Sequence, residues 1–520
     1  MRRMLFYNEL RTTRAAAQVM RRMFHPGGAG VSPANSSTET HAGETPALPR
    51  ASLSRGVIFL LLLPGLLPSF SLRAESPVPL PFYFLEPTDV LAASNVSFQA
   101  NSVLGQPPPP ILWPTPKDKP QCSYAPVSSE QRTDGVRIWY ERIDASEIEE
   151  TNQRVLCVGE IKQGKFVIPK LEHTLSAWPR EPNVIMQRSP YRSTWGGFNV
   201  HQILERPKGE DQAAPYAMIY WDQPRKGDAG GLLAISQNGL DWETSTETAL
   251  FTEHNDAYTL IWNERAREYW LYQTKLEDWP DKPYPDNLEK WRRVISLRHS
   301  RDLKSWSPQE VILRPDEQDP KAREFYLLKV FKCGSRFAGL LMRYKADPDR
   351  PRKHGSHTTT ELVLSDDGVH WRRSFRGVDV GFWSYADAFR QDGRFCFVTG
   401  GRSGLRILTL QGLVACGAQK KEGRPATASF VTHLFRFPEP GLFLNFDASK
   451  GVLNAELLDE KGNPFPGFTA SQCQFEAVTG TAVPLKWRNQ DFSQLKNRPM
   501  RLRFVLKNAS VYALLQNASI

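Results

Sequence analysis

Ser300-Arg301-Asp302-Leu303-Lys304-Ser305-Trp306 is the middle copy of a signature, Ser-x-Asp/Asn-x-x-x-Trp, that this 520-residue chain carries three times. The other copies are 236–242 and 365–371, so the steps from serine to serine are 64 and 65 residues. The Asp or Asn is expected to cap backbone N–H groups of a hairpin turn, and the Trp to lie between neighbouring sheets. Repeats longer than about 40 residues with short strands are typical of β-propeller blades.

Short strands are predicted on both sides of each turn. In the clearest repeat they are Tyr258–Trp262, Tyr269–Gln273, Val294–Arg298 and Val311–Leu313. Weaker copies precede and follow the three clear repeats, which gives five predicted blades over roughly 90–425. From about residue 428 apolar and polar residues alternate along several segments, as expected of an antiparallel β-sandwich. The predicted fold is therefore all-β, a five-bladed β-propeller followed by a jelly-roll-like sandwich.

Four segments are predicted along the chain. They are a disordered extension (1–54), a signal peptide (55–74), the propeller (75–427) and the sandwich (428–520). The signal peptide rests on Arg55, the apolar run 57–67 and the small residue Ala74 at the cleavage point. We therefore expect a secreted or periplasmic protein without a stable membrane span after cleavage. A long signal-anchor is the alternative reading of the same segment.

The charge and the cysteines exclude two classes of protein. Nine Arg and three Glu precede residue 75, a net +6, so only +4 of the total +10 belongs to the body of the chain. No basic stripe interleaved with aromatics follows, so nucleic acid is not an expected partner. The six cysteines have no metal-ligand spacing and form no dense disulfide framework. Cys122–Cys157 and Cys396–Cys416 could each form a disulfide, and buried thiols are the alternative.

Several motifs beyond the turns point to one group of proteins. They are His254-Asn255-Asp256, Pro315-Asp316-Glu317-Gln318-Asp319-Pro320 with Glu324-Phe325-Tyr326, Gly400-Gly401, Gly462-Asn463-Pro464-Phe465-Pro466-Gly467-Phe468 with Cys473, and Arg501-Leu502-Arg503-Phe504 to Tyr512. With them, residues 190–515 resemble secreted bacterial five-bladed propeller proteins related to glycoside hydrolase families 32 and 43. The resemblance implies a carbohydrate-active protein that acts on an oligo- or polysaccharide.

The innermost strand of each blade lines the central funnel of a propeller, so residues that open each repeat are the candidates. Glycoside hydrolysis needs one carboxylic acid and one carboxylate. We predict Glu324 as general acid, Asp256 as base or nucleophile, and Asp387 as the group that orients substrate or tunes the acid. The related families use three carboxylates in the order Asp, Asp, Glu from the first blade. This chain offers Asp, Glu, Asp from the third blade on.

Further funnel residues are predicted to bind substrate. Hydrogen-bonding candidates are Asn199, His201, His254 and Arg402, and stacking candidates are Trp195, Tyr326 and Trp383. No cofactor is expected, although the channel could hold a structural divalent cation such as calcium. The structural alternative is that the three acids cap turns or pair with arginines, and that the rings pack between blades.

Two other functions fit the same scaffold. A non-catalytic glycan-binding or surface protein would have kept the propeller and lost the acids. Related proteins commonly carry Trp-Asp at the start of the last blade, whereas here Asp387 follows Trp383 by four positions. A glycoside phosphorylase would replace one carboxylate by bound phosphate and would want cationic side chains in the funnel.

Overall fold

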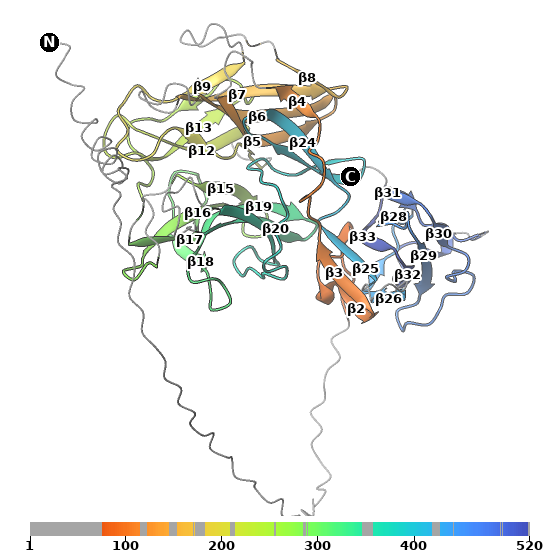
Figure 1. Ribbon diagram of the computed structural model, residues 1–520. Coiled ribbons are helices and arrows are strands. Elements are labelled where there is room, and N and C mark those ends of the chain that lie inside the picture. Colours follow the sequence, from red (N-terminus) through yellow and green to blue (C-terminus); the bar gives the residue numbers. More distant parts are fainter. Residues whose placement is uncertain are drawn as a thin grey trace, which may run out of the picture. The chain divides into compact units, whose positions relative to one another are not determined.

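The structure is a computed structural model. It describes residues 75–114, 122–144, 153–169, 171, 183–207, 214–253, 256–283, 288, 290–345, 357–418, 427–439, 441–488, 490 and 492–517. The predicted extension, the predicted signal peptide and His254 lie outside these residues. Within them the protein is all-β, and its only helical turns are the 3-10 turns Pro87–Asp89 and Ser493–Leu495 (Figure 1). The predicted fold class is confirmed.

Five antiparallel sheets follow one another in chain order between residues 111 and 410. Sheet 1 contains β5 (Cys122–Arg132), β6 (Gly135–Asp144), β7 (Gln153–Lys162), β8 (Lys165–Val167) and β9 (Val184–Gln187). Sheet 2 contains β10 (Asn199–Val200), β11 (Leu204–Glu205), β12 (Tyr216–Asp222), β13 (Gly230–Ser236) and β14 (Glu243–Thr244). Sheet 3 contains β15 (Tyr258–Asn263), β16 (Glu268–Asp278), β17 (Trp291–Ser300) and β18 (Glu310–Leu313).

The last two sheets complete the series. Sheet 4 contains β19 (Arg323–Cys333), β20 (Arg336–Lys345) and β21 (His357–Ser365). Sheet 5 contains β22 (Phe389–Gln391), β23 (Arg394–Thr399), β24 (Gly404–Leu410) and the much earlier strand β4 (Ile111–Pro114). An early strand that completes the last sheet is compatible with a closed ring of sheets. The arrangement of the five sheets as blades around one axis stays a prediction.

The turns have the capping chemistry that their sequence predicts. The Asp302 carboxylate accepts hydrogen bonds from the backbone N–H groups of Lys304 (2.8 Å) and Ser305 (2.7 Å), and the Ser300 hydroxyl accepts one from Leu303 (2.9 Å). Asp367 and Asn238 do the same in the other copies. The fourth turn residue has a positive φ in all three copies, and the middle copy adopts it with Leu303 (φ 64°) instead of glycine.

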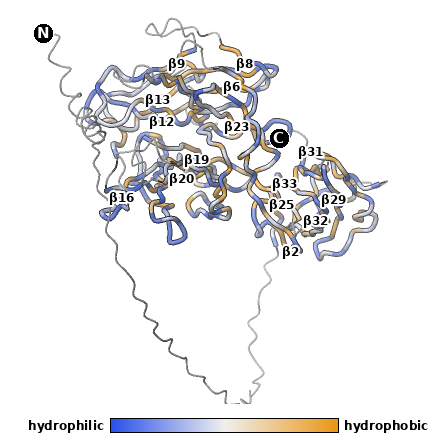
Figure 2. Tube along the Cα trace, viewed as in Figure 1, coloured by the Kyte–Doolittle hydropathy of each residue, from blue (hydrophilic) through white to orange (hydrophobic). Residues whose placement is uncertain are grey.

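The three tryptophans of the signature lie between sheets, as predicted. Trp242 packs against a core cluster shared by sheets 1 and 2, Trp306 against one shared by sheets 2 and 3, and Trp371 against one shared by sheets 3 and 4. Hydrophilic residues gather at the turns, whereas hydrophobic ones lie within the sheets (Figure 2). The repeated motif therefore joins neighbouring sheets.

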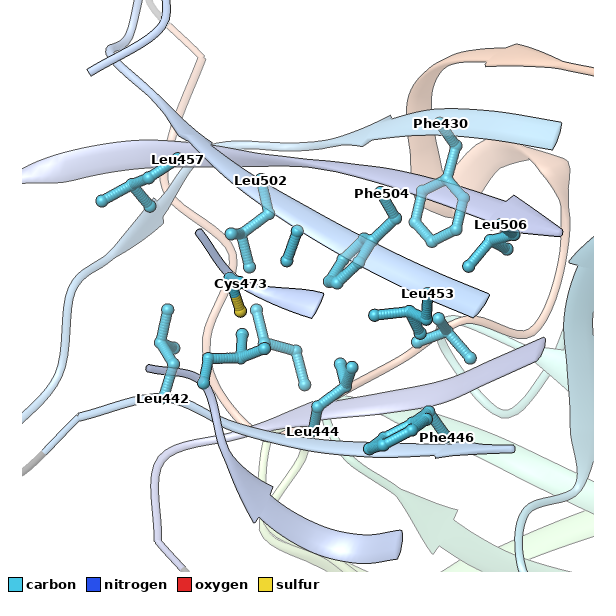
Figure 3. Packing of buried hydrophobic residues seen from close by; sticks show 14 of the residues in the cluster. Phe430, Leu442, Leu444, Phe446, Leu453, Leu457, Cys473, Leu502, Phe504 and Leu506 are labelled. Atoms are coloured by element: carbon cyan, nitrogen blue, oxygen red, sulfur yellow. The ribbon is translucent and has the colours of Figure 1, made fainter. Parts of the chain in front are cut away.

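Two further sheets form a β-sandwich. One contains β3 (Val96–Ala100), β25 (Val414–Ala418), β33 (Ser510–Leu515), β28 (Phe443–Asp447) and β31 (Thr479–Pro484), with β1 (Phe82–Tyr83) beside β33. The other contains β2 (Val90–Ser94), β26 (Thr427–Thr432), β32 (Pro499–Lys507), β29 (Val452–Leu458) and β30 (Gln474–Glu476), with β27 (Phe435–Arg436) beside β32. Their shared core is aromatic and aliphatic (Figure 3).

The sandwich differs from the prediction at its boundaries. Strands within residues 82–100 and β25 belong to its sheets, so it does not begin at residue 428. From residue 82 onward the described chain begins in the sandwich, passes through the five sheets and returns to it. All six cysteines are buried, and Cys157, Cys396 and Cys416 are thiols outside any disulfide, so neither Cys122–Cys157 nor Cys396–Cys416 forms and the alternative reading holds.

Candidate functional site

Side chains from several sheets converge on one group of polar and aromatic residues, here called the five-sheet cluster. Its members are Glu141 and Arg154 (sheet 1), Asn199 and His201 (sheet 2), Asp256 and Tyr258 (sheet 3), Tyr326 (sheet 4) and Tyr385, which precedes sheet 5. Four of the eight, Asn199, His201, Asp256 and Tyr326, were predicted from the sequence.

A chain of polar contacts crosses the cluster. The Asn199 amide donates a hydrogen bond to the Asp256 carboxylate (2.6 Å), and the Arg154 guanidinium donates one to the Asn199 side-chain oxygen. Arg154 also lies 3.4 Å from the Glu141 carboxylate, whose other oxygen accepts the N–H of Val200 (2.7 Å). Because Glu141 is buried and Asp256 is only half-buried, Asp256 is the more accessible of these two carboxylates.

A glycine allows the backbone to approach this chain closely. Gly196 has a φ of +67°, and a Cβ atom there would lie 3.2 Å from the indole nitrogen of Trp221 and 3.5 Å from the Asp256 carboxylate. A larger residue at this position would therefore be strained by its positive φ and would press on the Trp221 indole, while its contact with the Asp256 carboxylate would be an ordinary one.

Aromatic rings surround the polar chain. The His201 ring stacks on Tyr258 at 5.1 Å and meets Tyr385 edge-on at 4.6 Å. The Tyr258 hydroxyl donates a hydrogen bond to the Asn199 carbonyl (3.1 Å). Burial, together with the charges of Arg154 and Lys329, lowers the pKa of His201 to about 3. His201 is therefore a neutral, enclosed ring at neutral pH.

The two carboxylates of the cluster interact electrostatically. Burial raises the pKa of Glu141 to about 7, an effect that Arg154 and the Val200 N–H oppose and the charge of Asp256 reinforces. Burial also raises the pKa of Tyr385, on which Tyr326, Glu141 and Asp256 act in the same direction. Glu141 thus carries a proton for part of the time near neutral pH.

Glu324, the predicted general acid, lies elsewhere. Its side chain is fully enclosed, and its two oxygens lie 2.8 Å from the Arg293 guanidinium and 2.8 Å from the Lys282 ammonium. The Arg293 backbone N–H donates a third contact at 3.0 Å. Two buried cations pair with this side chain and leave no surface for a sugar, so this geometry supports the structural alternative for Glu324.

Asp387, the third predicted acid, also pairs with a cation. Its carboxylate lies 2.7 Å from the Lys329 ammonium and accepts the Gln202 amide at 2.7 Å. Burial lowers the pKa of Lys329, an effect that Asp387 opposes. The ion pair stabilises the ammonium group of the buried Lys329. None of the contacts described for Asp387 joins it to Asp256 or Glu141.

The remaining predicted residues are scattered. Trp195 packs against the core cluster between sheets 2 and 3, and its carbonyl accepts the Trp221 indole N–H (2.9 Å). Arg402 is exposed on the loop between β23 and β24. Trp383 meets Tyr385 edge-on at 5.4 Å, so it adjoins the cluster.

The described residues contain neither a metal-binding cluster nor a membrane-spanning helix. Among the described residues, no group of three His, Cys, Asp or Glu side chains could hold a metal ion. No helix in the described ranges is long and apolar enough to cross a membrane.

Comparison with known proteins gave structural likenesses only. No family model and no curated protein matches the chain. A solved glycoside hydrolase shares 14% identity with it at a TM-score of 0.37, covering 64% of this chain and 95% of its own. A β-xylosidase shares 11% at 0.39, covering 59% and 95%. A family 32 β-fructofuranosidase from Bombyx mori shares 10% at 0.35, covering 81% and 94%. These TM-scores are too low to carry an argument, so the site is argued from its own contacts.

Proposed function

We propose that this protein is carbohydrate-active and binds a sugar at the five-sheet cluster. The observation that supports the proposal is the convergence, from several sheets, of half-buried tyrosine rings on an accessible carboxylate and its amide partner. Sugars have apolar C–H faces and a rim of hydroxyls, so they need flat rings beside hydrogen-bonding groups. Tyr326 and Tyr385 provide the rings, and Asp256 accepts hydrogen bonds from sugar hydroxyls.

The polar chain explains why Asp256 suits this role. Its contact with Asn199 fixes the carboxylate, and Asn199 is itself held by Arg154 and lies in strand β10. A carboxylate that is positioned before the ligand arrives loses little conformational entropy on binding. The site therefore favours a ligand rich in hydroxyl donors.

Binding is tested with the chain from residue 75 onward on an array of plant, algal and microbial glycans, followed by titration calorimetry with the best ligand. Tyr326→Ala and Asp256→Asn are expected to weaken binding at least about tenfold, as loss of a ring or of a charged acceptor does. Asp241→Asn is the matched control, because Asp241 is exposed at an outer turn. Unchanged affinity in both site variants would overturn the proposal.

Hydrolysis of a glycosidic bond is the second candidate function. The observation that favours it is the pair of interacting carboxylates, Glu141 and Asp256, of which one has a pKa near 7. A buried carboxyl group that changes its charge near pH 7 makes the electrostatics beside an accessible carboxylate depend on pH in the range where acid–base catalysis operates. Asp256 keeps its predicted role as base or nucleophile. Glu141 is enclosed and does not meet the sugar, so its change of charge near pH 7 acts on the site through Arg154 and Asn199.

Hydrolysis is tested by sugar release from aryl glycosides and polysaccharides. Asp256→Asn should abolish turnover with the fold intact, and Glu141→Gln should shift the pH profile of turnover. Binding without release would assign the protein to the glycan-binding class. Export through the segment 55–74 and the absence of a cofactor stay predictions.

A further inference from the structure

A cavity adjoins the five-sheet cluster. It has a volume of about 490 Å³ and is bounded by the proline run Pro107–Pro109, by Tyr124 of sheet 1, by Thr399 at the end of β23, and by Trp383 and Tyr385. Ligand pockets of proteins usually measure about 300–1,000 Å³ and combine apolar walls with a few polar groups. This cavity fits that description in both size and lining.

Tyr385 belongs to both sites. It lines the cavity together with Trp383, and its ring also meets His201 inside the five-sheet cluster. The charges of Glu141 and Asp256 act on its hydroxyl. Tyr385 is therefore the residue at which the cluster and the cavity adjoin.

The proline wall is fixed in place. The chain leaves the sandwich at β3 and passes along this wall to reach β4 in sheet 5 (Figure 1). The Arg406 guanidinium of β24 donates a hydrogen bond to the Pro109 carbonyl, and the Val103 N–H donates one to the Val380 carbonyl (2.9 Å). Proline fixes the φ angle, so the wall is already ordered before a ligand binds.

A glycine, Gly381, allows the backbone at Leu104, just before the proline run, to pack closely against it. Gly381 has a φ of +80°, and a Cβ atom there would lie 2.9 Å from the backbone nitrogen of Leu104. The Ser102 hydroxyl donates a hydrogen bond to the Asp379 carbonyl (2.7 Å) on the same side. The cavity is thus closed in part by a chain segment that belongs to neither sheet 1 nor sheet 5.

We infer that this cavity is a second sugar subsite, so that the ligand of the five-sheet cluster is an oligosaccharide of at least two units. The inference rests on the proposed function. The first unit contacts Asp256 and Tyr326, and the next unit lies past Tyr385 against Trp383 and the proline wall. The indole ring offers an apolar face for a sugar ring, and Thr399 offers a hydroxyl partner.

The test compares titrations of a monosaccharide glycoside and of oligosaccharides of increasing length that contain the same sugar. The wild-type protein should bind the disaccharide or trisaccharide at least about tenfold more tightly than the monosaccharide, a gain of about 1.4 kcal/mol. Trp383→Ala should remove that gain, and because its ring meets Tyr385, Thr399→Phe is the variant that should leave monosaccharide affinity unchanged. Thr399→Phe keeps Trp383 and fills the cavity, so it should have the same effect and covers the case in which Trp383→Ala does not fold.

The outcomes separate the two proposals. If no glycan binds the wild-type protein, the proposed function and this inference fail together. If glycans bind but length makes no difference, the inference fails and the proposed function stands. The inference also fails if folded Thr399→Phe weakens monosaccharide and oligosaccharide equally, or if neither variant affects the longer ligand.

Discussion

Replacing Glu324 by glutamine tests whether this carboxylate is structural or catalytic. The side chain is fully enclosed, and its partners Arg293 and Lys282 have side chains that are 2% and 3% exposed. The substitution removes the negative charge that both buried cations share. Breaking a buried ion pair on one side costs about 3–5 kcal/mol. Glu324→Gln should therefore lose that much free energy of unfolding.

The assay is equilibrium unfolding in urea, followed by tryptophan fluorescence. Asp256→Asn is the matched control, because Asp256 is half-buried and asparagine retains a side-chain oxygen that can accept the Asn199 amide. We expect it to lose less than about 1.5 kcal/mol, the range of a single hydrogen bond. If Glu324→Gln unfolds at the same urea concentration as the wild-type protein, the structural reading of Glu324 is wrong.

Three further predictions concern ionisation, turns and thiols. Burial raises the pKa of Glu141 from 4.5 to about 7, so the stability contributed by the protonated carboxyl is lost as the pH rises through that interval. The free energy of unfolding of Glu141→Gln, relative to that of the wild-type protein, should therefore increase by about 3 kcal/mol between about pH 4.5 and pH 8, as measured by urea unfolding. Asp302→Ala should cost about 1 kcal/mol because two backbone N–H groups lose their acceptor, whereas Asp241→Ala, which removes only an acceptor of the Asn238 amide, should cost less. All six cysteines are buried, so a thiol reagent should label none in the native protein and six after denaturation; rapid native labelling would contradict the packing described here.

Local features of the fold could be predicted from the sequence. The Ser-x-Asp-x-x-x-Trp turns depend on contacts within seven residues, and both the capping by Asp302 and the position of Trp306 followed from that spacing. The sandwich boundary could not be predicted, because β3 pairs with β25 across more than three hundred residues. Alternation of polar and apolar residues predicts a strand but does not identify its partner.

The candidate site shows the same limit. Asn199 and Asp256 were found because they open repeats, and the structure joins them by a hydrogen bond. Glu324 also opens a repeat, but its side chain lies against Arg293 of β17, and direction along a strand start is not visible in the sequence. β19 carries a register shift between Phe325 and Leu327, so simple alternation fails at Tyr326.

The residues that sequence reasoning missed had weak signals. Glu141 and Arg154 belong to β6 and β7, the second and third strands of sheet 1. The sequence-based prediction covered only residues that open a repeat, so it did not include these two. Tyr385 lies between Trp383 and Asp387, the two residues of this segment that the sequence predicted to be functional. A search for tyrosines near each predicted inner strand would have found both Tyr258 and Tyr385.

The most direct test of the central claim is a crystal structure of the chain from residue 75 onward with its best-binding oligosaccharide. We expect sugar density in contact with Asp256 and Tyr326, continuing past Tyr385 toward Trp383. Density at the outer turns or in the sandwich alone, with the five-sheet cluster empty, would contradict it.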